Sequence, residues 1–581
     1  MKCVLARKGR TFCKSIWRVR QTEKTRSVLE VLLNKFLALE EEKLKKSRTI
    51  LFVLTLLIWG GMYYYYLPAL NIHSEESWMF FVAAILVGLV LNFWPIFKVL
   101  FLERDGVVVD KAEKWKTAKK LLIVPIALCV VYGVGMLLSS PIIRAGAYRE
   151  LLDVQTGDFA SDIHEVNYNQ IPILDSDSAA RLAEREMGSM VDMVSQYEVS
   201  PYFNQINYQG KPVRVTPLQY GDLIKWFTNR STGVPAYITI DMTTQDVDLI
   251  KLQEGIKISP FEHFGRNLNR YIRFRYPTAM IRAYNFEIND EGVPYWVCSV
   301  EDKTIGLFGG TDIKGAIIIN AVTGEHEYYD VADVPTWVDK VYDSSLLIEQ
   351  YDYYGTLVNG FINSIFGQRG CLMSTEGHNY IALNDDVWLY TGVTSIGGDE
   401  SNVGFVLMNS RTKETKYYQI SGAKEYSAMS SAEGQVQHLN YDATFPILLN
   451  IADEPTYFLS LKDGAGLVKK YAMVNIQKYQ IVAIGDTVAE CEKTYRSLMA
   501  DGGISNVDTS AAQSITGTIT MMKDIVSEGN TYWYLMLEGS DALFEGKAKE
   551  HLEIMKKQVG SSATVEYVPQ NEDVNTILSV K

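Results

Sequence analysis

The sequence is poor in the residues that hold metals and form disulfides. It has six cysteines and seven histidines among 581 residues, with no CxxC pair and no HExxH motif. Three cysteines, Cys298, Cys371 and Cys491, follow Pro141, and three thiols cannot all pair with one another. These features exclude a scaffold built on disulfides and predict free, mostly buried thiols.

Recognisable catalytic signatures are also missing, including the GxSxG nucleophile motif. The glycine-rich segment 306–310 has no helix start behind it, so we interpret it as a loop and not as a phosphate site. Segment 397–402, GGDESN, offers oxygens of the kind that Ca²⁺ binds, but hairpin loops have the same composition. Cys371 and His378 lack a third residue to orient them. We therefore predict no catalytic, cofactor-binding or metal-binding residues.

Charged side chains are absent from three long apolar runs, residues 50–70, 78–97 and 121–139. Each run approaches or exceeds the roughly 20 apolar residues that cross a bilayer core of about 30 Å. The first run starts too far into the chain for a signal peptide. We predict three transmembrane helices that bind the lipid bilayer, and the absence of charge within them favours an anchor over a channel.

The loops give the predicted helices a direction. Residues 1–48 carry 14 Lys and Arg against 5 Asp and Glu, and the loop 102–120 carries six basic residues. The loop 71–77 has two glutamates and no basic residue. Because basic segments stay on the cytoplasmic side, we expect a multi-pass cell-membrane protein with a cytoplasmic N-terminus. Residues after about 141 are then extracytoplasmic.

The basic head has apolar residues at helical spacing over 26–46, which predicts an amphipathic helix. This helix either lies on the inner membrane surface or a partner, or continues into the first span. The body after Pro141 is acidic, with 35 Lys and Arg against 58 Asp and Glu. That charge argues against nucleic acid as a partner.

The first part of the outer body is mixed in character. Residues 144–175 have the composition of a polar stalk with some strand. An N-cap cluster at Asp175–Asp177 precedes apolar residues at helical spacing to Val194, which predicts a helix of about five turns. A short helix over 219–229 and a hairpin over 234–252 are expected next. Further helical pieces are expected at 262–273, 343–363, 421–434 and 487–500.

One local pattern occurs four times in the outer body. An apolar strand ends in Asp or Asn, meets a polar turn and resumes as a strand, at Asp241, Asn320, Asn409 and Asn475. The spacing of the four copies is too long and irregular for a solenoid or propeller. It predicts repeated helix-plus-meander modules of α+β class. The tyrosine clusters at 328–329 and 351–354 are interpreted mainly as packing residues.

The second and fourth copies, at Asn320 and Asn475, resemble a known type of module. Residues 294–297 with Asn320 and the turn 323–325, and residues 455–458 with 471–475, resemble the PepSY type of extracytoplasmic module. The stretch 200–500 is similar to a group of uncharacterised membrane-anchored Firmicutes proteins, sometimes labelled colicin V production protein-like. The resemblance implies tandem helix-plus-antiparallel-sheet modules and supplies no catalytic residues.

The C-terminal part follows a segment rich in Gly, Ser and Ala. Its patterns predict strands at 515–526, 531–538 and 542–545, a helix at 547–558, and strands at 563–568 and 576–580. Three strands, a helix and two strands is the order of an OB-like β-barrel, and a generic five-stranded unit is the alternative. An OB face usually binds nucleic acid or sugars, and here a protein or glycan contact or a structural cap fits the setting better.

We divide the chain into six parts: 1–48 basic cytoplasmic head, 49–143 three-span membrane anchor, 144–330 first PepSY-like region, 331–500 second PepSY-like region, 501–513 linker, and 514–581 OB-like domain. The expected function is non-enzymatic binding of an envelope protein or glycan, as a scaffold, sensor or protease inhibitor. The alternatives are an envelope enzyme with a site assembled between modules, and an accessory subunit of a transporter. The sequence does not indicate an oligomeric state.

Overall fold

The computed structural model describes residues 49–101, 111–165, 171–383, 385–397, 401–501, 513–527, 530–548, 551–569 and 574–581. The chain is a mixed α+β protein, as the sequence predicts. It divides into two compact units, residues 1–491 and 492–581. The predicted head 1–48, with its amphipathic helix, and residues 502–512 of the predicted linker lie outside the described residues.

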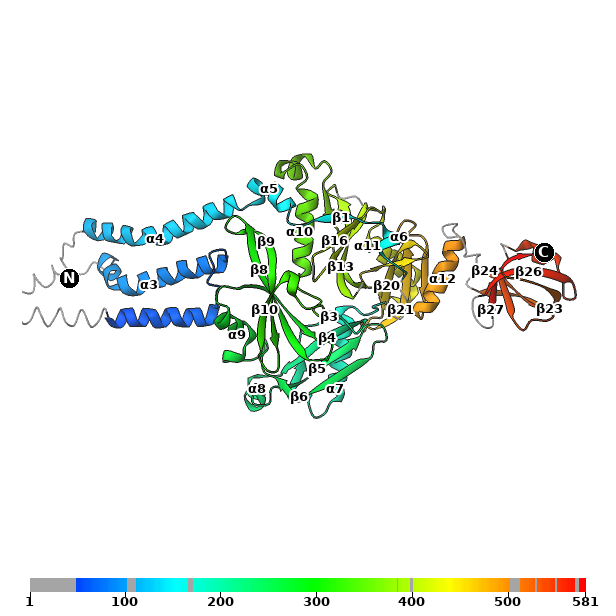
Figure 1. Cartoon of the computed structure of the whole chain (residues 1–581), viewed down its shortest axis with the longest axis horizontal. Coiled ribbons are helices and arrows are strands. Elements are labelled where there is room, and N and C mark those ends of the chain that lie inside the picture. The colour runs from blue at the N-terminus through cyan, green and yellow to red at the C-terminus, as the bar shows by residue number, and fades with distance from the viewer. Residues whose placement is uncertain are drawn as a thin grey trace, which may run out of the picture. The chain divides into compact units, whose positions relative to one another are not determined.

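Three helices open the described chain, and they cover the three apolar runs (Figure 1). They are Thr49–Tyr66, α3 (Glu75–Phe101) and α4 (Lys111–Leu138). By length and composition, Thr49–Tyr66 is the one described helix able to cross a bilayer. There are two such spans if Leu122–Leu138 and the next helix α5 (Pro141–Arg149), which meet at a bend of 48°, form one broken span.

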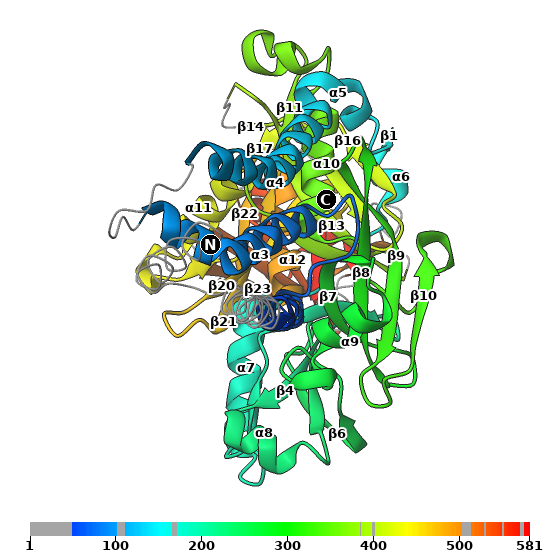
Figure 2. The same ribbon diagram turned by 90° about the vertical axis from the view of Figure 1, so that its left-hand side faces the viewer.

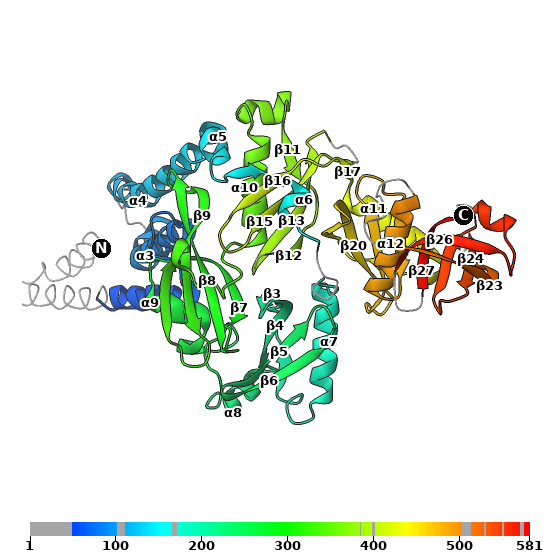
Figure 3. The same ribbon diagram turned by 45° about the vertical axis from the view of Figure 1, so that its right-hand side comes forward.

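Four sheets follow, each built mainly from strands that are close in sequence and pair antiparallel (Figure 3). The strands are β3 (Asn204–Tyr208), β4 (Lys211–Tyr220), β5 (Val234–Asp241) and β6 (Val247–Ile256) in the first sheet; β7 (Met280–Ile288), β8 (Pro294–Ile305), β9 (Gly309–Asn320) and β10 (His326–Asp330) in the second; β12 (Asn379–Leu383), β13 (Asp386–Ser395), β15 (Gly404–Asn409) and β16 (Thr415–Tyr418) in the third; and β19 (Ile447–Ile451), β20 (Glu454–Lys462), β21 (Val468–Asn475) and β22 (Val482–Gly485) in the fourth.

The first, third and fourth sheets share a further feature near their first strands. A short extra strand, β2 (Tyr197–Val199), β11 (Leu372–Ser374) or β18 (Asp442–Ala443), pairs with the far half of β4, β13 or β20. In the second sheet one long strand, β7, takes the place of both the short extra strand and the first strand. It pairs with β8 from Pro294 to Glu301, with a register shift between Ile281 and Ala283. A helix precedes each sheet, namely α7 (Ser176–Ser189), α9 (Leu268–Arg275), α10 (Ser344–Thr356) and α11 (Glu425–Gln435). A two-residue ladder, β14 (Ser401–Asn402) with β17 (Gly422–Ala423), completes this unit.

The turn after the third strand explains the pattern seen in the sequence. Asn320 Oδ1 accepts hydrogen bonds from the backbone N–H groups of Val322 and Thr323, both at 2.9 Å. Asp241 and Asn409 accept the same two bonds in their own six-residue turns. The fifth turn position has positive φ in all three, and Gly324 takes φ +79° there without the cost of a Cβ. Asn475 begins a longer turn and accepts one bond, from the N–H of Lys478 at 2.7 Å.

Replacement of Asn320 by alanine is expected to lower the free energy of unfolding by about 1 kcal/mol, because two turn N–H groups lose their acceptor. Thermal unfolding of the full chain in detergent, followed by tryptophan fluorescence, measures the change. The matched variant Asn320→Asp keeps the acceptor oxygen and should stay close to the unchanged protein. Equal losses in both variants would contradict this account of the turn.

Several predicted helices shift at their ends. Asp175 caps α7 as predicted, since its Oδ1 accepts from the N–H of Ser178 at 2.9 Å, but the helix ends at Ser189. The predicted helix 219–229 is wrong in its first turn, because β4 continues to Tyr220 and α8 spans Leu223–Asn229. The predicted helix 343–363 ends early, at Thr356.

One hydrophobic core of this unit lies around α10, between the second and third sheets. Leu346, Leu347 and Tyr351 of α10 are buried against Ile318 of the second sheet and Leu389 of the third. The predicted boundary between residues 330 and 331 therefore falls inside one continuous core. Tyr351 is 1 % exposed, which fits the packing interpretation of its cluster, and Tyr328, Tyr329, Tyr353 and Tyr354 are half-buried.

Residues 154–165 and 171–175, which we call the strap, run along the third and fourth sheets. Strand β1 (Val154–Thr156) pairs in parallel with β16, and the short helix α6 (Phe159–Asp162) follows. Asn450 Nδ2 donates to the Ile163 carbonyl at 2.7 Å, and Ser460 Oγ donates to the Ile173 carbonyl at 2.7 Å. The predicted polar stalk is therefore wrong, because the strap buries Ile163, Ile171 and Leu174 against the body.

Helix α12 (Val488–Asp501) carries the chain into the second unit, which contains a closed five-stranded barrel. Its strands are β23 (Gln513–Ser527), β24 (Asn530–Leu537), β25 (Leu543–Lys547), β26 (Ser562–Pro569) and β27 (Val574–Val580), in the order β23-β24-β25-β27-β26. The predicted order of three strands, a helix and two strands is present. The helix is shorter than predicted, a 3₁₀ segment at Leu552–Lys556, because β25 extends to Lys547.

Candidate functional site

The turn between β8 and β9, residues 305–309, contacts the ends of the N-terminal helices. Ser139 Oγ, at the end of α4, accepts hydrogen bonds from the N–H groups of Leu307 at 2.8 Å and Phe308 at 3.1 Å. The Phe308 ring lies edge-on to Trp78 of α3, with centroids 5.9 Å apart. Gly306 has φ +65°, and a Cβ there would come within 2.5 Å of Ser139 Oγ. Glycine at this position thus lets the turn meet α4.

A second contact joins α9 to the chain after helix Thr49–Tyr66. Arg273 is 5 % exposed, and its Nε donates to the Leu67 carbonyl at 2.9 Å. Its Nη1 donates to the carbonyls of Pro277 at 3.3 Å and Ala279 at 2.6 Å. The N–H of Leu70 donates to the same Pro277 carbonyl at 2.7 Å. The second sheet and α9 therefore fix the body to the helix ends at two separate places.

A hollow of about 530 Å³ opens on the outer face of α10. It is lined by Ser344, Ser345, Ile348, Glu349, Asp352, Tyr353, Thr356 and His378. Burial raises the pKa of Asp352 from its ordinary value, although the Ser374 N–H, which donates to it at 2.8 Å, acts the other way. Burial, followed by the charge of Lys340, lowers the pKa of His378. The lining therefore combines hydroxyl and carboxyl groups with an imidazole whose protonation is disfavoured.

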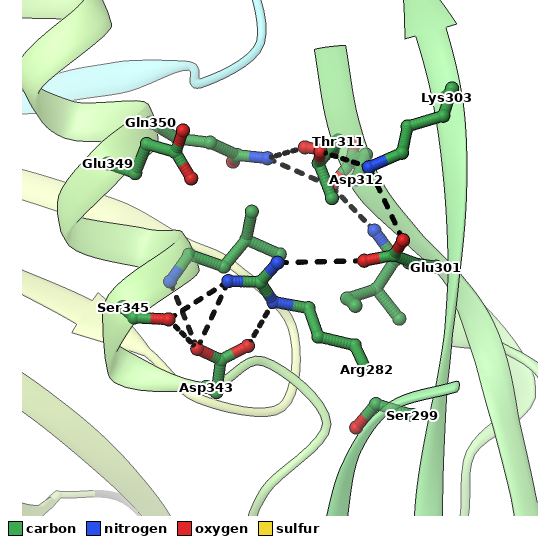
Figure 4. A network of polar contacts seen from close by, with 12 residues as sticks. Arg282, Ser299, Glu301, Lys303, Thr311, Asp312, Asp343, Ser345, Glu349 and Gln350 are labelled. Atoms are coloured by element: carbon green, nitrogen blue, oxygen red, sulfur yellow. Dashed lines mark hydrogen bonds and ion pairs between the residues drawn. The ribbon is translucent and has the colours of Figure 1, made fainter. Parts of the chain in front are cut away.

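A network of paired charges borders this hollow and holds α10 on the second sheet (Figure 4). Arg282 of β7 hydrogen-bonds Asp343, donates to Ser345 Oγ at 2.9 Å, and lies 3.5 Å from Glu301. Burial acts to lower the pKa of Arg282, but the hydrogen bond to Asp343 and nearby carboxylates raise it overall. Arg282 therefore stays charged and fixes the first turn of α10.

The far side of the network lies around Asp312 on β9. Lys413 Nζ contacts both Asp312 carboxylate oxygens, at 2.8 and 2.9 Å. Gln350 of α10 donates to the Thr311 carbonyl at 2.7 Å, and Lys303 Nζ lies 3.3 Å from Glu301 (Figure 4). These contacts fix the α10 backbone, and with it the positions of the hollow's carboxylates.

A pair of buried acids lies where the first and second sheets meet. Glu287 on β7 is fully buried and accepts hydrogen bonds from the N–H groups of Asp339 at 2.9 Å and Lys340 at 3.1 Å, and from Asn204 Nδ2 at 3.1 Å. Asp339 is 2 % exposed and accepts from the Asn207 N–H at 2.7 Å. Burial raises the pKa of Glu287 to about 7. Burial and the neighbouring Glu287 raise the pKa of Asp339 well above its ordinary value.

The structure places the residues that the sequence singled out in different surroundings. Cys371 is buried, and its Sγ donates to the Thr356 carbonyl at 3.1 Å. Burial raises the pKa of this thiol. His378 lines the hollow and stands edge-on to Tyr380. Among the described contacts, no hydrogen bond joins Cys371 to His378, so the thiol–imidazole pair considered from the sequence is not formed.

The described end of the GGDESN segment and the acidic residue Asp386 make structural contacts. Residues 398–400 of the GGDESN segment lie outside the described residues, and Asn402 points inward to Glu425, with its Nδ2 3.3 Å from both carboxylate oxygens. Asp386 forms a two-bond ion pair with Arg411 at 2.7 and 2.9 Å. In the described part of the chain, no group of three or more His, Cys, Asp or Glu side chains has the arrangement of a metal site.

Sequence reasoning missed the hollow. Its signal is the set of polar residues at helical spacing in the predicted helix 343–363, including Ser345, Glu349, Asp352 and Thr356. An exposed helix face also has this composition, and only the packing of α10 shows that the face is concave.

No protein family matches the chain, and no curated protein is significantly similar to it. The likeness to PepSY modules therefore stays a prediction from the sequence.

Proposed function

We propose that the chain is a membrane-anchored cell-envelope protein whose extracytoplasmic body binds a protein or glycan partner. In this proposal Thr49–Tyr66, α3 and α4 cross the bilayer, with the N-terminus in the cytoplasm. The four sheets are PepSY-like modules, and the C-terminal barrel is OB-like. The observation that carries the proposal is the double attachment of the body to the helix ends, through Ser139 and through Arg273.

The exposed apolar surface of the helices supports the anchor. Phe52 and Leu57 of the first helix are 58 % and 68 % exposed, and Ile123 and Val130 of α4 are 59 % and 57 % exposed. Exposing apolar surface to water costs about 25 cal/mol per Å², and a lipid environment removes this cost. The polar contacts of Ser139 and Arg273 lie just beyond the apolar segments, where an aqueous boundary is expected.

The hollow on α10 is the proposed binding site. Glu349 and Asp352 are one helical turn apart, and hydroxyl groups surround them. Such a lining offers hydrogen bonds to a glycan and charge to an amino group of a protein partner. α10 is fixed to the second sheet, and the second sheet also contacts the helix ends. A movement of α10 on binding at the hollow would therefore reach the membrane segment.

An envelope enzyme is the second candidate. The observation that favours it is the raised pKa of Asp352, since a carboxyl group whose pKa is raised by burial can act as a general acid. The imidazole of His378 lies in the same hollow.

Photocrosslinking in intact cells tests the binding function. A benzoylphenylalanine in place of Tyr353 is expected to capture a discrete extracytoplasmic partner, identified by mass spectrometry. Glu349→Gln in the same protein should reduce capture roughly tenfold, because a charge-assisted hydrogen bond contributes about 1.5–3 kcal/mol. The same photoreactive residue at Tyr479, an exposed tyrosine in the turn between β21 and β22, is the matched control.

Sidedness is read in the same cells. Glu291→Cys should react with a membrane-impermeant maleimide before lysis, and the native Cys3 and Cys13 of the head only after lysis. The proposal fails if Tyr353 and Tyr479 positions capture the same proteins. It also fails if the head reacts before lysis and residue 291 does not.

A further inference from the structure

An exposed apolar cluster lies on the first sheet's helix α8 and the neighbouring 3₁₀ turn Phe264–Arg266. Leu223, Ile224 and Phe227 are 62 %, 76 % and 60 % exposed, and Phe264 is 64 % exposed. Single exposed apolar residues are ordinary, but four large ones together in a soluble environment mark a contact surface.

The inner face of α8 is held firmly, so that this cluster has a fixed direction. Trp226 is 5 % exposed, and its Nε1 donates to Glu262 Oε2 at 2.8 Å. Tyr220 OH donates to the other Glu262 oxygen at 2.8 Å, and the His263 ring packs edge-on to Trp226 at 4.6 Å. The exposed residues of α8 cannot turn inward without breaking these buried hydrogen bonds.

Basic side chains lie among the apolar ones. The Arg230 guanidinium lies 4.3 Å from the Phe227 ring centroid, and Arg266 hydrogen-bonds the Arg230 carbonyl. The nearby acids are already paired, because Asp222 lies 3.3 Å from Lys225 Nζ and Glu262 is buried. This combination of apolar and basic groups stands out on a body with excess acidic charge.

The cluster is continuous with the end of the first helix. Arg270 Nη1 donates to the Phe264 carbonyl at 3.2 Å, and the same guanidinium lies 4.2 Å from the Tyr64 ring centroid. Phe274, one turn further along α9, packs edge-on to Tyr63 at 6.3 Å. Figures 1 and 2 show α8 and α9 on the side of the body from which the helices extend.

We propose that Leu223, Ile224, Phe227 and Phe264, with Arg230 and Arg266, form a second membrane contact that sits in the headgroup layer of the same bilayer. The inference rests on the proposed anchor. Apolar side chains enter the headgroup–acyl boundary, and the guanidinium groups bind lipid phosphates. Tyr63–Tyr66 supply the aromatic belt beside it. The body is then held flat against the membrane at a fixed tilt, with α8 as its outer support.

Fluorescence quenching in nanodiscs tests this contact on the full chain. Cys3, Cys13 and Cys129 are replaced by serine, and an environment-sensitive dye is placed at Ile224→Cys, at Leu57→Cys in the first helix, or at Tyr479→Cys in the turn between β21 and β22. The lipids are phosphatidylcholine with phosphatidylglycerol, with a quencher just below the headgroup. Quenching at positions 57 and 224 is expected to be several-fold stronger than at 479. Phosphatidylcholine alone should weaken it at 224 only.

The outcomes separate this inference from the anchor itself. Quenching at 57 without quenching at 224 overturns the second contact and leaves the anchor in place. Absence of quenching at both positions overturns the anchor as well. If the dye at position 224 becomes shielded from water as the protein concentration rises, and the lipid quencher has no effect on it, the surface binds a second copy of the chain. That result also overturns the proposal.

The variant Arg230→Gln with Arg266→Gln gives an independent measurement on the charge. It should remove the difference between the two lipid compositions at position 224 while leaving position 57 unchanged. An unchanged lipid dependence would show that these arginines do not bind the phosphates.

Discussion

Replacing Arg273 by methionine is expected to lower the free energy of unfolding by about 3 kcal/mol or more and to loosen the body from the helix ends. The guanidinium donates to the carbonyls of Leu67, Pro277 and Ala279 in a nearly buried site. A methionine of similar volume removes this donor from the Leu67 and Ala279 carbonyls, while the Pro277 carbonyl keeps its hydrogen bond from the Leu70 N–H. Each orphaned group costs about 1–3 kcal/mol before relaxation, and water entering the site reduces the total below the sum of the two.

Two measurements follow the effect of Arg273→Met in the full chain. Thermal unfolding in detergent reports stability, and limited proteolysis between Leu67 and Ser74 reports release of the connecting loop. Arg273→Lys retains one donor group, so its stability should lie between those of the unchanged protein and Arg273→Met. Arg275→Met, on the exposed side of the same helix, is the matched control, since that side chain contacts mainly the Tyr271 ring and carbonyl. Equal effects at 273 and 275 would rule out the buried guanidinium as the attachment.

The buried pair Glu287 and Asp339 is expected to make the protein less stable as pH rises. The pKa of Glu287 is about 7 in the folded chain against an ordinary 4.5, so the folded state holds the proton over a range in which the unfolded state has lost it. The stabilising effect is complete below pH 4.5 and is lost as pH rises to about 7. At about 1.36 kcal/mol per pKa unit, a shift of this size corresponds to roughly 3 kcal/mol.

The variant Asp339→Asn separates the charge from the hydrogen bonds. Asparagine still offers an oxygen to the Asn207 N–H but cannot ionise, so Glu287 no longer faces a second carboxyl group. We expect the variant to be more stable than the unchanged protein at pH 8 and to show a flatter profile from pH 5 to 8. Glu287→Ala, in contrast, should destabilise at every pH, because three donors lose their acceptor. A profile unchanged by Asp339→Asn would contradict the assignment.

Local chemistry made part of the fold predictable. In each of the turns at Asp241, Asn320 and Asn409, one side-chain oxygen accepts hydrogen bonds from the backbone N–H groups two and three residues further on. The cap of α7 at Asp175 is equally local. Such contacts do not depend on distant parts of the chain, and the sequence therefore carries them plainly.

Contacts between distant segments were out of reach of the same reasoning. The strap looked like a stalk because its apolar residues, such as Ile163 and Ile171, are separated by polar ones and find their partners in the third and fourth sheets. The first turn of the predicted helix 219–229 is strand because β2 pairs with β4 at Leu218–Tyr220. The hollow of α10 depends on how the helix packs, which helical spacing alone does not determine.

The position of the strap has a consequence for how the protein is made. Val154 pairs with Thr415, 261 positions later (415 minus 154). At ribosomal rates of about 5–20 residues per second, the strap waits roughly 10–50 s for its partner strand to emerge. During that interval Ile163, Ile171 and Leu174 have no core to enter, while the intervening sheets can already form. In the proposed topology, in which the body is exported, the strap is therefore expected to need a chaperone beyond the translocation channel until residue 418 has arrived.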